Sequence, residues 1–177
     1  MNYHNITTDD MLNGDGLRVV LWVSGCSLEC KNCHNPQTWD FNSGIPFTDD
    51  DMQEILECLS KPYISGLTLT GGHPLEAENL ETVKTIVQTV KEKFPEKDIW
   101  LYTGFRWENI SRVITHPEEK GEYDYILADF LPLIDVVVDG RYRDELRDIT
   151  LPFRGSSNQR VIDVKKSLET GEVVLYK

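Results

Sequence analysis

The chain has 177 residues, of which 30 are acidic and 18 basic, so its formal net charge is −12 at pH 7. This length suits one domain and is too short for a complete eight-fold (βα) barrel, which takes about 250 residues. The negative charge repels phosphate backbones and argues against nucleic acid as a partner. The first residues lack the basic and apolar regions of a secretory signal, and no apolar run approaches the roughly 20 residues that a membrane span needs. We therefore expect a cytoplasmic protein that binds neither nucleic acid nor a membrane.

The N-terminal third predicts one buried strand and one helix. Residues 1–15 are polar and end in a turn-forming run, so the first strand is expected at 17–24. Its apolar residues do not alternate with polar ones, which is typical of a strand covered on both faces. A helix is expected to follow Thr48, a candidate N-cap with three aspartates behind it, and to end before Pro62.

The remaining elements continue the alternation of strand and helix. Strands are expected at 66–70, 98–103 and 134–138, short strands at 160–164 and 173–176, helices at 78–93 and 107–116, a loop with a short helix near 125–130 within 117–133, and a polar turn or helix at 165–171. Such alternation indicates repeated βα units and a mostly parallel sheet, which right-handed crossovers would curl into a partial barrel. We predict a single α/β domain over 1–177, with its core at about 13–163.

Three of the four cysteines lie close together directly after the first predicted strand. Cys26, Cys30 and Cys33 have the spacing C-x3-C-x2-C. Three thiolates on one loop can take three corners of a metal or iron–sulfur centre, and in a reducing compartment such a group favours metal binding or catalysis over a disulfide. A four-iron cluster held by three cysteines leaves one iron open to an outside ligand, whereas electron carriers are normally closed by four.

Two other readings of the cysteines remain open at this point. A structural zinc site could use the three cysteines and His34, although adjacent residues such as Cys33 and His34 rarely aim both side chains at one ion. A closed cluster carrier could use Cys58 as its fourth ligand. Cys58 lies on the apolar side of its predicted helix, and this position favours a buried, inert thiol.

A glycine-rich turn follows the second predicted buried strand. In Gly71-Gly72-His73-Pro74, the glycines let the backbone approach a ligand closely and the proline fixes the exit of the chain. An ordinary turn would have the same composition. Because this turn and the cysteine loop follow parallel strands, we expect both at the same edge of the sheet, with His73 exposed to solvent.

Polar residues at later strand ends are further candidates. Thr103 and Asp139 follow apolar strands, where side chains are often functional, although a carboxylate in Asp-Gly can also simply cap a turn. The run from Gly155 to Gln159 offers many hydrogen-bond donors, and a bare turn explains it equally well.

The cysteine triplet together with the Gly-Gly-x-Pro turn resembles the radical S-adenosylmethionine (SAM) enzymes. Within them the chain is similar to one family, the activating proteins of anaerobic (class III) ribonucleoside-triphosphate reductases, over about 13–163. The motifs that carry this resemblance are NGDGLR at 13–18, WVSGC at 22–26, CHNPQTWD at 33–40, YTG at 102–104, VDGR at 138–141 and RGSSNQR at 154–160.

The resemblance implies a reaction and its cofactors. In such enzymes the three cysteines hold a [4Fe-4S] cluster, and the amino and carboxylate groups of SAM bind its open iron. The reduced cluster cleaves SAM to methionine and a 5′-deoxyadenosyl radical, which takes a hydrogen atom from a glycine of the partner reductase. The implied electron donor is a reduced flavodoxin- or ferredoxin-type protein. The runner-up is an activase of another glycyl-radical enzyme, such as formate acetyltransferase, but the Asn-Pro-Gln-Thr-Trp-Asp run favours the reductase.

The resemblance also implies which residues contact SAM. By position these are Gly71, Gly72, Pro74, Thr103, Asp139, Asn158 and Gln159. His73 stands where related enzymes often carry an acidic residue, and a contact made through the backbone of the turn does not depend on that side chain. No side chain is assigned as catalytic.

Overall fold

A seven-stranded mixed sheet organises the computed structural model, which describes residues 1–116 and 121–176. The strands, in the order β3–β1–β2–β4–β5–β6–β7, are β3 (Ile45–Pro46), β1 (Asn2–Asp10), β2 (Leu17–Val23), β4 (Ile64–Gly71), β5 (Asp98–Tyr102), β6 (Val136–Asp139) and β7 (Arg160–Asp163). The central four, β2, β4, β5 and β6, are parallel, and their flanking partners are antiparallel. The predicted α/β class with a mostly parallel sheet is confirmed.

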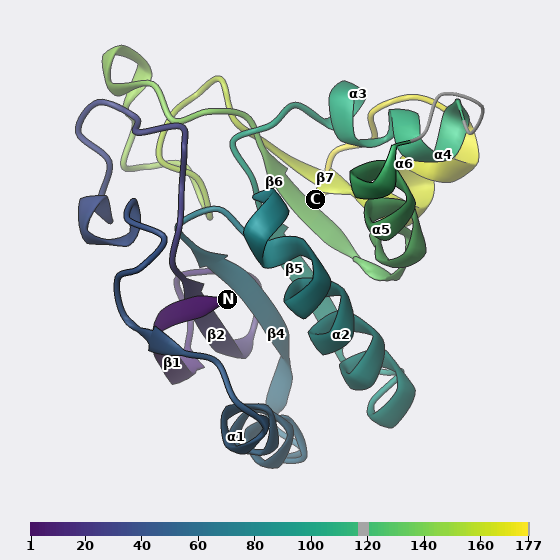
Figure 1. The fold of residues 1–177 in the computed structure, drawn as a ribbon. Coiled ribbons are helices and arrows are strands. Elements are labelled where there is room, and N and C mark those ends of the chain that lie inside the picture. The colour runs from purple at the N-terminus through teal and green to yellow at the C-terminus, as the bar shows by residue number, and fades with distance from the viewer. Residues whose placement is uncertain (117–120, 177) are drawn as a thin grey trace.

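Helices cover one face of this sheet (Figure 1). They are α1 (Asp49–Leu59), α2 (Ala77–Lys93), α3 (Trp107–Ile110), α4 (Arg112–Thr115), α5 (Glu122–Phe130) and α6 (Val164–Thr170), with 3-10 turns η1 (Pro36–Thr38), η3 (Leu131–Leu133) and η4 (Asp144–Leu146). The first helix begins where predicted, because the backbone N–H and the hydroxyl of Thr48 both donate to the Asp51 carboxylate, at 2.6 and 2.8 Å. No described helix is both long enough and apolar enough to cross a bilayer.

Both faces of the central strands are covered, as the apolar sequence of β2 predicted. In β5, Ile99 and Leu101 belong to the core beneath the helices, whereas Trp100 belongs to a smaller cluster on the other face. There Trp100 packs edge-on against Phe153 and Tyr176, with ring centroids 5.1 Å apart in each case. These aromatic contacts hold the end of the chain against the sheet.

Three details differ from the sequence-based expectations. The strand predicted at 17–24 is the second along the chain and not the first. It is preceded by β1 (Asn2–Asp10), which pairs with it antiparallel. At 173–176 only Leu175 forms an isolated bridge, to Ile162. The helix expected at 107–116 is divided at Ser111 into α3 and α4. The polar segment predicted as a turn or helix at 165–171 does form a helix, α6. The part of the 117–133 prediction at 117–120 lies outside the described residues.

Candidate functional site

The cysteine loop begins directly after β2, at the carboxyl end of the parallel strands (Figure 1). Cys26, Cys30 and Cys33 are half-buried free thiols. Two non-glycine residues with left-handed backbone, Glu29 (φ 43°) and Asn32 (φ 56°), each come immediately before a cysteine. Such conformations are uncommon outside glycine and turn the chain sharply. These two turns set the directions in which Cys30 and Cys33 leave the backbone.

Backbone hydrogen bonds tie the start of this loop to its neighbours. Gly25 and Cys26 donate their N–H groups to the carbonyls of Thr38 and Trp39, at 2.7 and 3.1 Å. From the glycine-rich turn, His73 donates its N–H to the carbonyl of Gly25 at 2.7 Å. The two loops therefore form one unit.

The glycines of the turn are needed for this contact. A Cβ on Gly72 would lie 2.6 Å from the carbonyl oxygen of Gly25, and Gly71 has φ +104°, a left-handed conformation that disfavours other residues. The close approach that the sequence predicted at these positions is made by the backbone of the cysteine loop. Contact with SAM at Gly71, Gly72 and Pro74 stays a prediction.

The donor set fits an iron–sulfur cluster better than a single metal ion. Within 1–116 and 121–176, no three or more His, Cys, Asp or Glu side chains are gathered around one point, as tetrahedral zinc would require. A four-iron cluster binds each thiolate to a different iron, so it needs sulfurs that are spread more widely. Burial raises the pKa of the Cys26 thiol, and the backbone N–H of Asn35 donates to the sulfur of Cys33 at 3.3 Å. Hydrogen bonds of this kind help to set cluster potentials.

Cys58 lies at the other end of the sheet. It is at the end of α1, just before β4 begins at Ile64, whereas Cys26 follows the end of β2, which runs parallel to β4. The eight residues of β4 span about 25 Å at roughly 3.3 Å per residue. Cys58 packs against the hydrophobic core, and burial raises the pKa of its thiol. This position rules out the closed carrier with Cys58 as fourth ligand.

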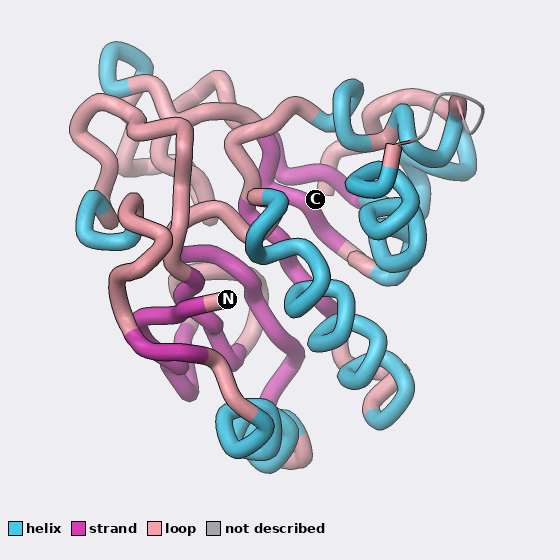
Figure 2. Tube along the Cα trace, in the orientation of Figure 1, coloured by secondary structure: helices cyan, strands magenta, loops and turns pink. Residues whose placement is uncertain are grey.

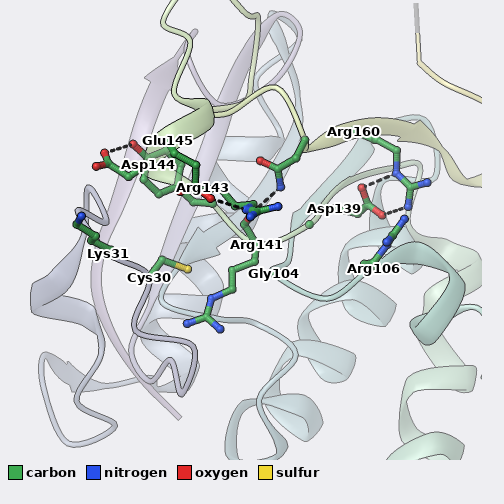
Figure 3. A pocket seen from close by; sticks show the side chains of 13 residues that line it. Cys30, Lys31, Gly104, Arg106, Asp139, Arg141, Arg143, Asp144, Glu145 and Arg160 are labelled. Carbon is green, nitrogen blue, oxygen red and sulfur yellow. Dashed lines mark hydrogen bonds and ion pairs between the residues drawn. The ribbon is translucent and has the colours of Figure 1, made fainter.

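A cavity of about 570 Å³ opens beside the cysteine loop. Figure 3 shows Cys30 and Lys31 on one side, and the ion pair of Asp139 with Arg160 on the other. The lining residues are Cys30, Lys31, Gly104, Arg106, Asp139, Gly140, Arg141, Tyr142, Arg143, Asp144, Glu145, Asn158 and Arg160. Of the residues predicted to contact SAM, Asp139 and Asn158 therefore line this cavity.

Asp139 is almost wholly buried and already has partners. Its carboxylate accepts from the backbone N–H of Trp107 at 2.7 Å and from Arg160 at 3.0 and 2.5 Å. Arg160 also grips both oxygens of Glu108 at 2.9 Å, which lowers the pKa of Glu108 to about 2. Asp139 thus holds the start of α3 and orients Arg160 on the cavity wall. A direct contact with SAM stays a prediction.

The side-chain amides of Asn158 and Gln159, at the end of the loop 155–159, differ in how many of their hydrogen-bonding atoms have partners. Asn158 donates to the carbonyl of Arg141 at 2.8 Å, while its Oδ1 is buried without a partner. Gln159 accepts from the N–H of Gly155 at 3.0 Å and donates to the carbonyl of Gly140 at 3.0 Å. Asn158 lines the cavity, and its contact with SAM stays a prediction. The Gln159 amide holds its own loop to the end of β6, and its contact with SAM stays a prediction.

The expectation that His73 is exposed to solvent is wrong. Its side chain is 2% exposed, because the ring packs edge-on against Phe105 at 4.4 Å, under the start of α2. Its Nε2 lies 2.8 Å from the hydroxyl of Thr103, and its Nδ1 lies 3.0 Å from Glu76. Thr103 thus contacts the glycine-rich turn and does not line the cavity.

Sequence reasoning missed the positive lining of the cavity. Lys31, Arg106, Arg143 and Arg160 come from four separate segments, so no local pattern could have marked them as a group. Arg141 lies within the VDGR motif and donates to the carbonyl of Leu28 in the cysteine loop. Five cationic and three acidic side chains line the cavity, so in a chain of net charge −12 its wall is net positive and favours anionic groups.

A mostly parallel α/β sheet, with a three-cysteine loop and a glycine-rich turn joined at its carboxyl edge, defines an iron–sulfur protein of the radical SAM class. Over residues 12–162 the chain matches the family described as a 4Fe-4S single cluster domain.

Named relatives identify the family more closely. The chain is 43% identical over 161 residues to the anaerobic ribonucleoside-triphosphate reductase-activating protein of Enterobacteria phage T4, covering 91% of this chain and 93% of the relative. The proteins of the same name from Haemophilus influenzae and Escherichia coli are 40% and 37% identical, with 90% and 91% of this chain and 96% and 97% of the relatives covered. The chain belongs to the family of anaerobic ribonucleoside-triphosphate reductase-activating proteins.

Proposed function

We propose that this chain activates an anaerobic ribonucleoside-triphosphate reductase by generating a glycyl radical on it, with a [4Fe-4S] cluster and SAM as cofactors. The observation that carries the proposal is the loop of three free thiols at the carboxyl edge of the sheet, next to a cavity that Cys30 lines. The names of relatives that are 37–43% identical support the choice of partner.

Cys26, Cys30 and Cys33 would hold the cluster, each through one iron. When bound, the reduced cluster and SAM supply an electron and a 5′-deoxyadenosyl radical, which abstracts a hydrogen atom from a glycine of the reductase. The protein's part in this chemistry is to bind, to orient and to exclude competing reactions.

The cavity explains how this chain would orient SAM. A molecule bound there lies beside Cys30, and its carboxylate finds the positive charge of Arg141 and of the other cations on the wall. Asn158, which lines the same cavity, would contact the bound molecule as well. Gly71, Gly72 and Pro74 would contact SAM through the backbone of the turn, which the N–H groups of Gly72 and His73 hold against Val23 and Gly25.

The reaction also needs an electron donor and a compartment. We assign the donor to the class of reduced flavodoxin- or ferredoxin-type proteins, because cluster reduction takes one electron at a time at low potential. The free thiols suit a reducing compartment, so we place the protein in the cytoplasm together with the reductase that it would activate.

An anaerobic reconstitution tests the proposal. Purified protein is supplied with iron and sulfide, then with SAM, reductant and the candidate reductase. We expect a brown protein that bleaches with dithionite, production of 5′-deoxyadenosine, and a glycyl radical signal by electron paramagnetic resonance. A colourless, zinc-loaded protein would overturn the cofactor assignment. Cleavage of SAM with a radical on formate acetyltransferase, and none on the reductase, would overturn the partner assignment alone.

A further inference from the structure

A buried polar chain runs beneath the cysteine loop. His73 lies in the glycine-rich turn, and Glu76 follows three residues later at the N-cap of α2. Their side chains are 2% and 11% exposed, and Nδ1 of His73 lies 3.0 Å from a carboxylate oxygen of Glu76. On its other side the His73 ring contacts the hydroxyl of Thr103 at 2.8 Å. Buried polar groups persist when they are hydrogen-bonded, and here every ring nitrogen has a partner.

The hydrogen bonds assign the donors in this chain. The bond from His73 holds the pKa of Glu76 at about 2, so the carboxylate is ionised and can only accept. His73 therefore donates from Nδ1. The backbone N–H of Phe105 donates to the Thr103 hydroxyl oxygen at 3.0 Å, and the hydroxyl keeps its hydrogen and a second lone pair for Nε2. The network therefore places a proton on Nδ1 of His73.

The other end of the chain reaches the cysteine loop. The same Glu76 oxygen that meets His73 accepts from the backbone N–H and from the hydroxyl of Ser27, both at 2.8 Å. Ser27 directly follows Cys26, and Gly25, which precedes Cys26, accepts from the N–H of His73 at 2.7 Å. Both neighbours of the first cysteine are thus held from one turn.

The Glu76 contacts are not explained by capping of helix α2. Glu76 stands at the N-cap position of α2, but its side chain makes no capping hydrogen bond. Its bonds go instead to Ser27, an exposed residue of the loop, and to His73. The carboxylate is directed toward the cysteine loop at the expense of the usual local role of such a residue.

We propose that His73 and Glu76 are positioning residues for the first cluster ligand. His73 orients the Glu76 carboxylate, the carboxylate anchors Ser27, and Cys26 is thereby held in place for a cluster that it must bind together with Cys30 and Cys33. This inference rests on the proposed function. Groups that orient metal ligands from behind typically change metal affinity by about 10- to 100-fold when they are removed.

Two amide variants of His73 separate positioning from packing. In His73→Asn the amide nitrogen takes the place of Nδ1 and keeps a donor toward Glu76, whereas in His73→Gln it takes the place of Nε2 and keeps only the contact with Thr103. If His73 positions Glu76, the His73→Gln variant loses iron faster than the His73→Asn variant. Packing predicts the reverse, because Asn is smaller and leaves more space beside Phe105.

The measurement is the rate at which the reconstituted protein loses iron to a chelator, followed by loss of its brown colour. We expect His73→Gln and Glu76→Ala to lose iron about tenfold faster than wild type, and His73→Asn to stay within about threefold of wild type. Ser27→Ala keeps the backbone bond to Glu76, and at this exposed position it should fold normally, with about a threefold increase. Thermal unfolding of each cluster-free variant reports its folding.

Asp163→Asn is the matched control. It removes a carboxylate charge from the start of α6, where Asp163 accepts from the N–H of Lys166, at the end of the sheet away from the cysteines. We expect its iron loss to match wild type. Nitrogen-15 NMR of the cluster-free protein should show the Nδ1–H tautomer of His73.

The outcomes distinguish this inference from the proposed function. Iron loss from His73→Asn as fast as from His73→Gln, wild-type retention in Ser27→Ala and Glu76→Ala, or an Nε2–H tautomer would each overturn the inference and leave the activase proposal intact. A wild-type protein that takes up no iron–sulfur cluster would overturn the activase proposal, and the inference with it.

Discussion

The two ends of the parallel strands use polar side chains in opposite ways. At the amino ends, Arg18 is wholly buried and donates to the hydroxyl of Thr68 and the carbonyl of Leu67, at 2.8 and 3.0 Å, and forms an ion pair with Asp98 at 2.5 Å. At the carboxyl ends, cationic side chains surround a cavity of about 570 Å³. The comparison teaches that charge alone does not mark a site. Cations at both ends have acceptors inside the chain, as Arg160 has in Asp139, so what matters is whether the paired groups enclose open space.

Other cations at the amino ends repeat this arrangement. Lys97 donates to the carbonyls of Ile64 and Lys61, at 2.5 and 3.1 Å, and Lys91 pairs with Asp135 at 2.7 Å. These contacts tie the starts of neighbouring elements together and stabilise the sheet. Loops, which tolerate open geometry better than strands, gather at the carboxyl end (Figure 2).

The largest effect that separates the two ends concerns the cysteines. Replacing any one of Cys26, Cys30 and Cys33 by serine should abolish the brown iron–sulfur chromophore and the activity, because a cluster with two protein ligands is not retained. Iron content and absorption after anaerobic reconstitution measure this loss. Cys58→Ser is the control, and it should keep the cluster because Cys58 lies at the amino ends of the strands. Normal iron content in Cys30→Ser would contradict the assignment.

The next effect concerns Arg18, which we expect to contribute to the free energy of unfolding but not to cluster binding. Arg18→Met should lower the free energy of unfolding by about 3 kcal/mol, because it leaves Thr68 and Asp98 without their buried donor. Urea unfolding of the cluster-free protein measures the loss, and the cluster spectrum of the folded variant should be unchanged. Lys84→Met, which breaks the exposed pair with Asp129, should change stability by less than about 1 kcal/mol. A destabilisation equal to that of Arg18→Met would contradict the distinction.

Acid should weaken the support beneath the cysteine loop. The pKa of Glu76 is lowered from 4.5 to about 2, so its contribution to stability is fully present above pH 4.5 and is lost as the pH falls toward 2. Over that window we expect the free energy of unfolding to fall more steeply for the wild type than for Glu76→Gln. Unfolding curves of the cluster-free proteins at several pH values test this. Parallel curves over the whole window would show that Glu76 titrates normally.

The smallest effect concerns backbone strain in the cysteine loop. Glu29 has φ 43°, so Glu29→Gly should raise the free energy of unfolding of the cluster-free protein by about 0.5 kcal/mol, the relief of left-handed strain less the entropy of glycine. Glu57→Gly, at an exposed position inside α1, should instead lower it by about 1 kcal/mol. Denaturant unfolding compares the two variants. If both were less stable than the wild type, the backbone at Glu29 would not be strained.

Elements with strong apolar periodicity were predictable from local sequence. The strands β4 and β5 and the helix α2 lie within two residues of their predicted positions, because each has a continuous buried stripe bounded by glycine or proline. The strand β1 was missed because its residues are polar and mostly half-exposed. It is held by backbone pairing with β2, which leaves little signal in side-chain pattern.

The sequence by itself determined the family, the three candidate ligands and the alternation that builds the sheet, because these depend on residue types at short, covalently set spacings. Only the tertiary structure decided that Cys58 lies far from the other cysteines, that His73 is buried on Glu76, and that scattered cations line one cavity. Those outcomes depend on strand order, which brings together residues such as Ser27 and Glu76, 49 positions apart. Spacing along the chain does not encode such contacts.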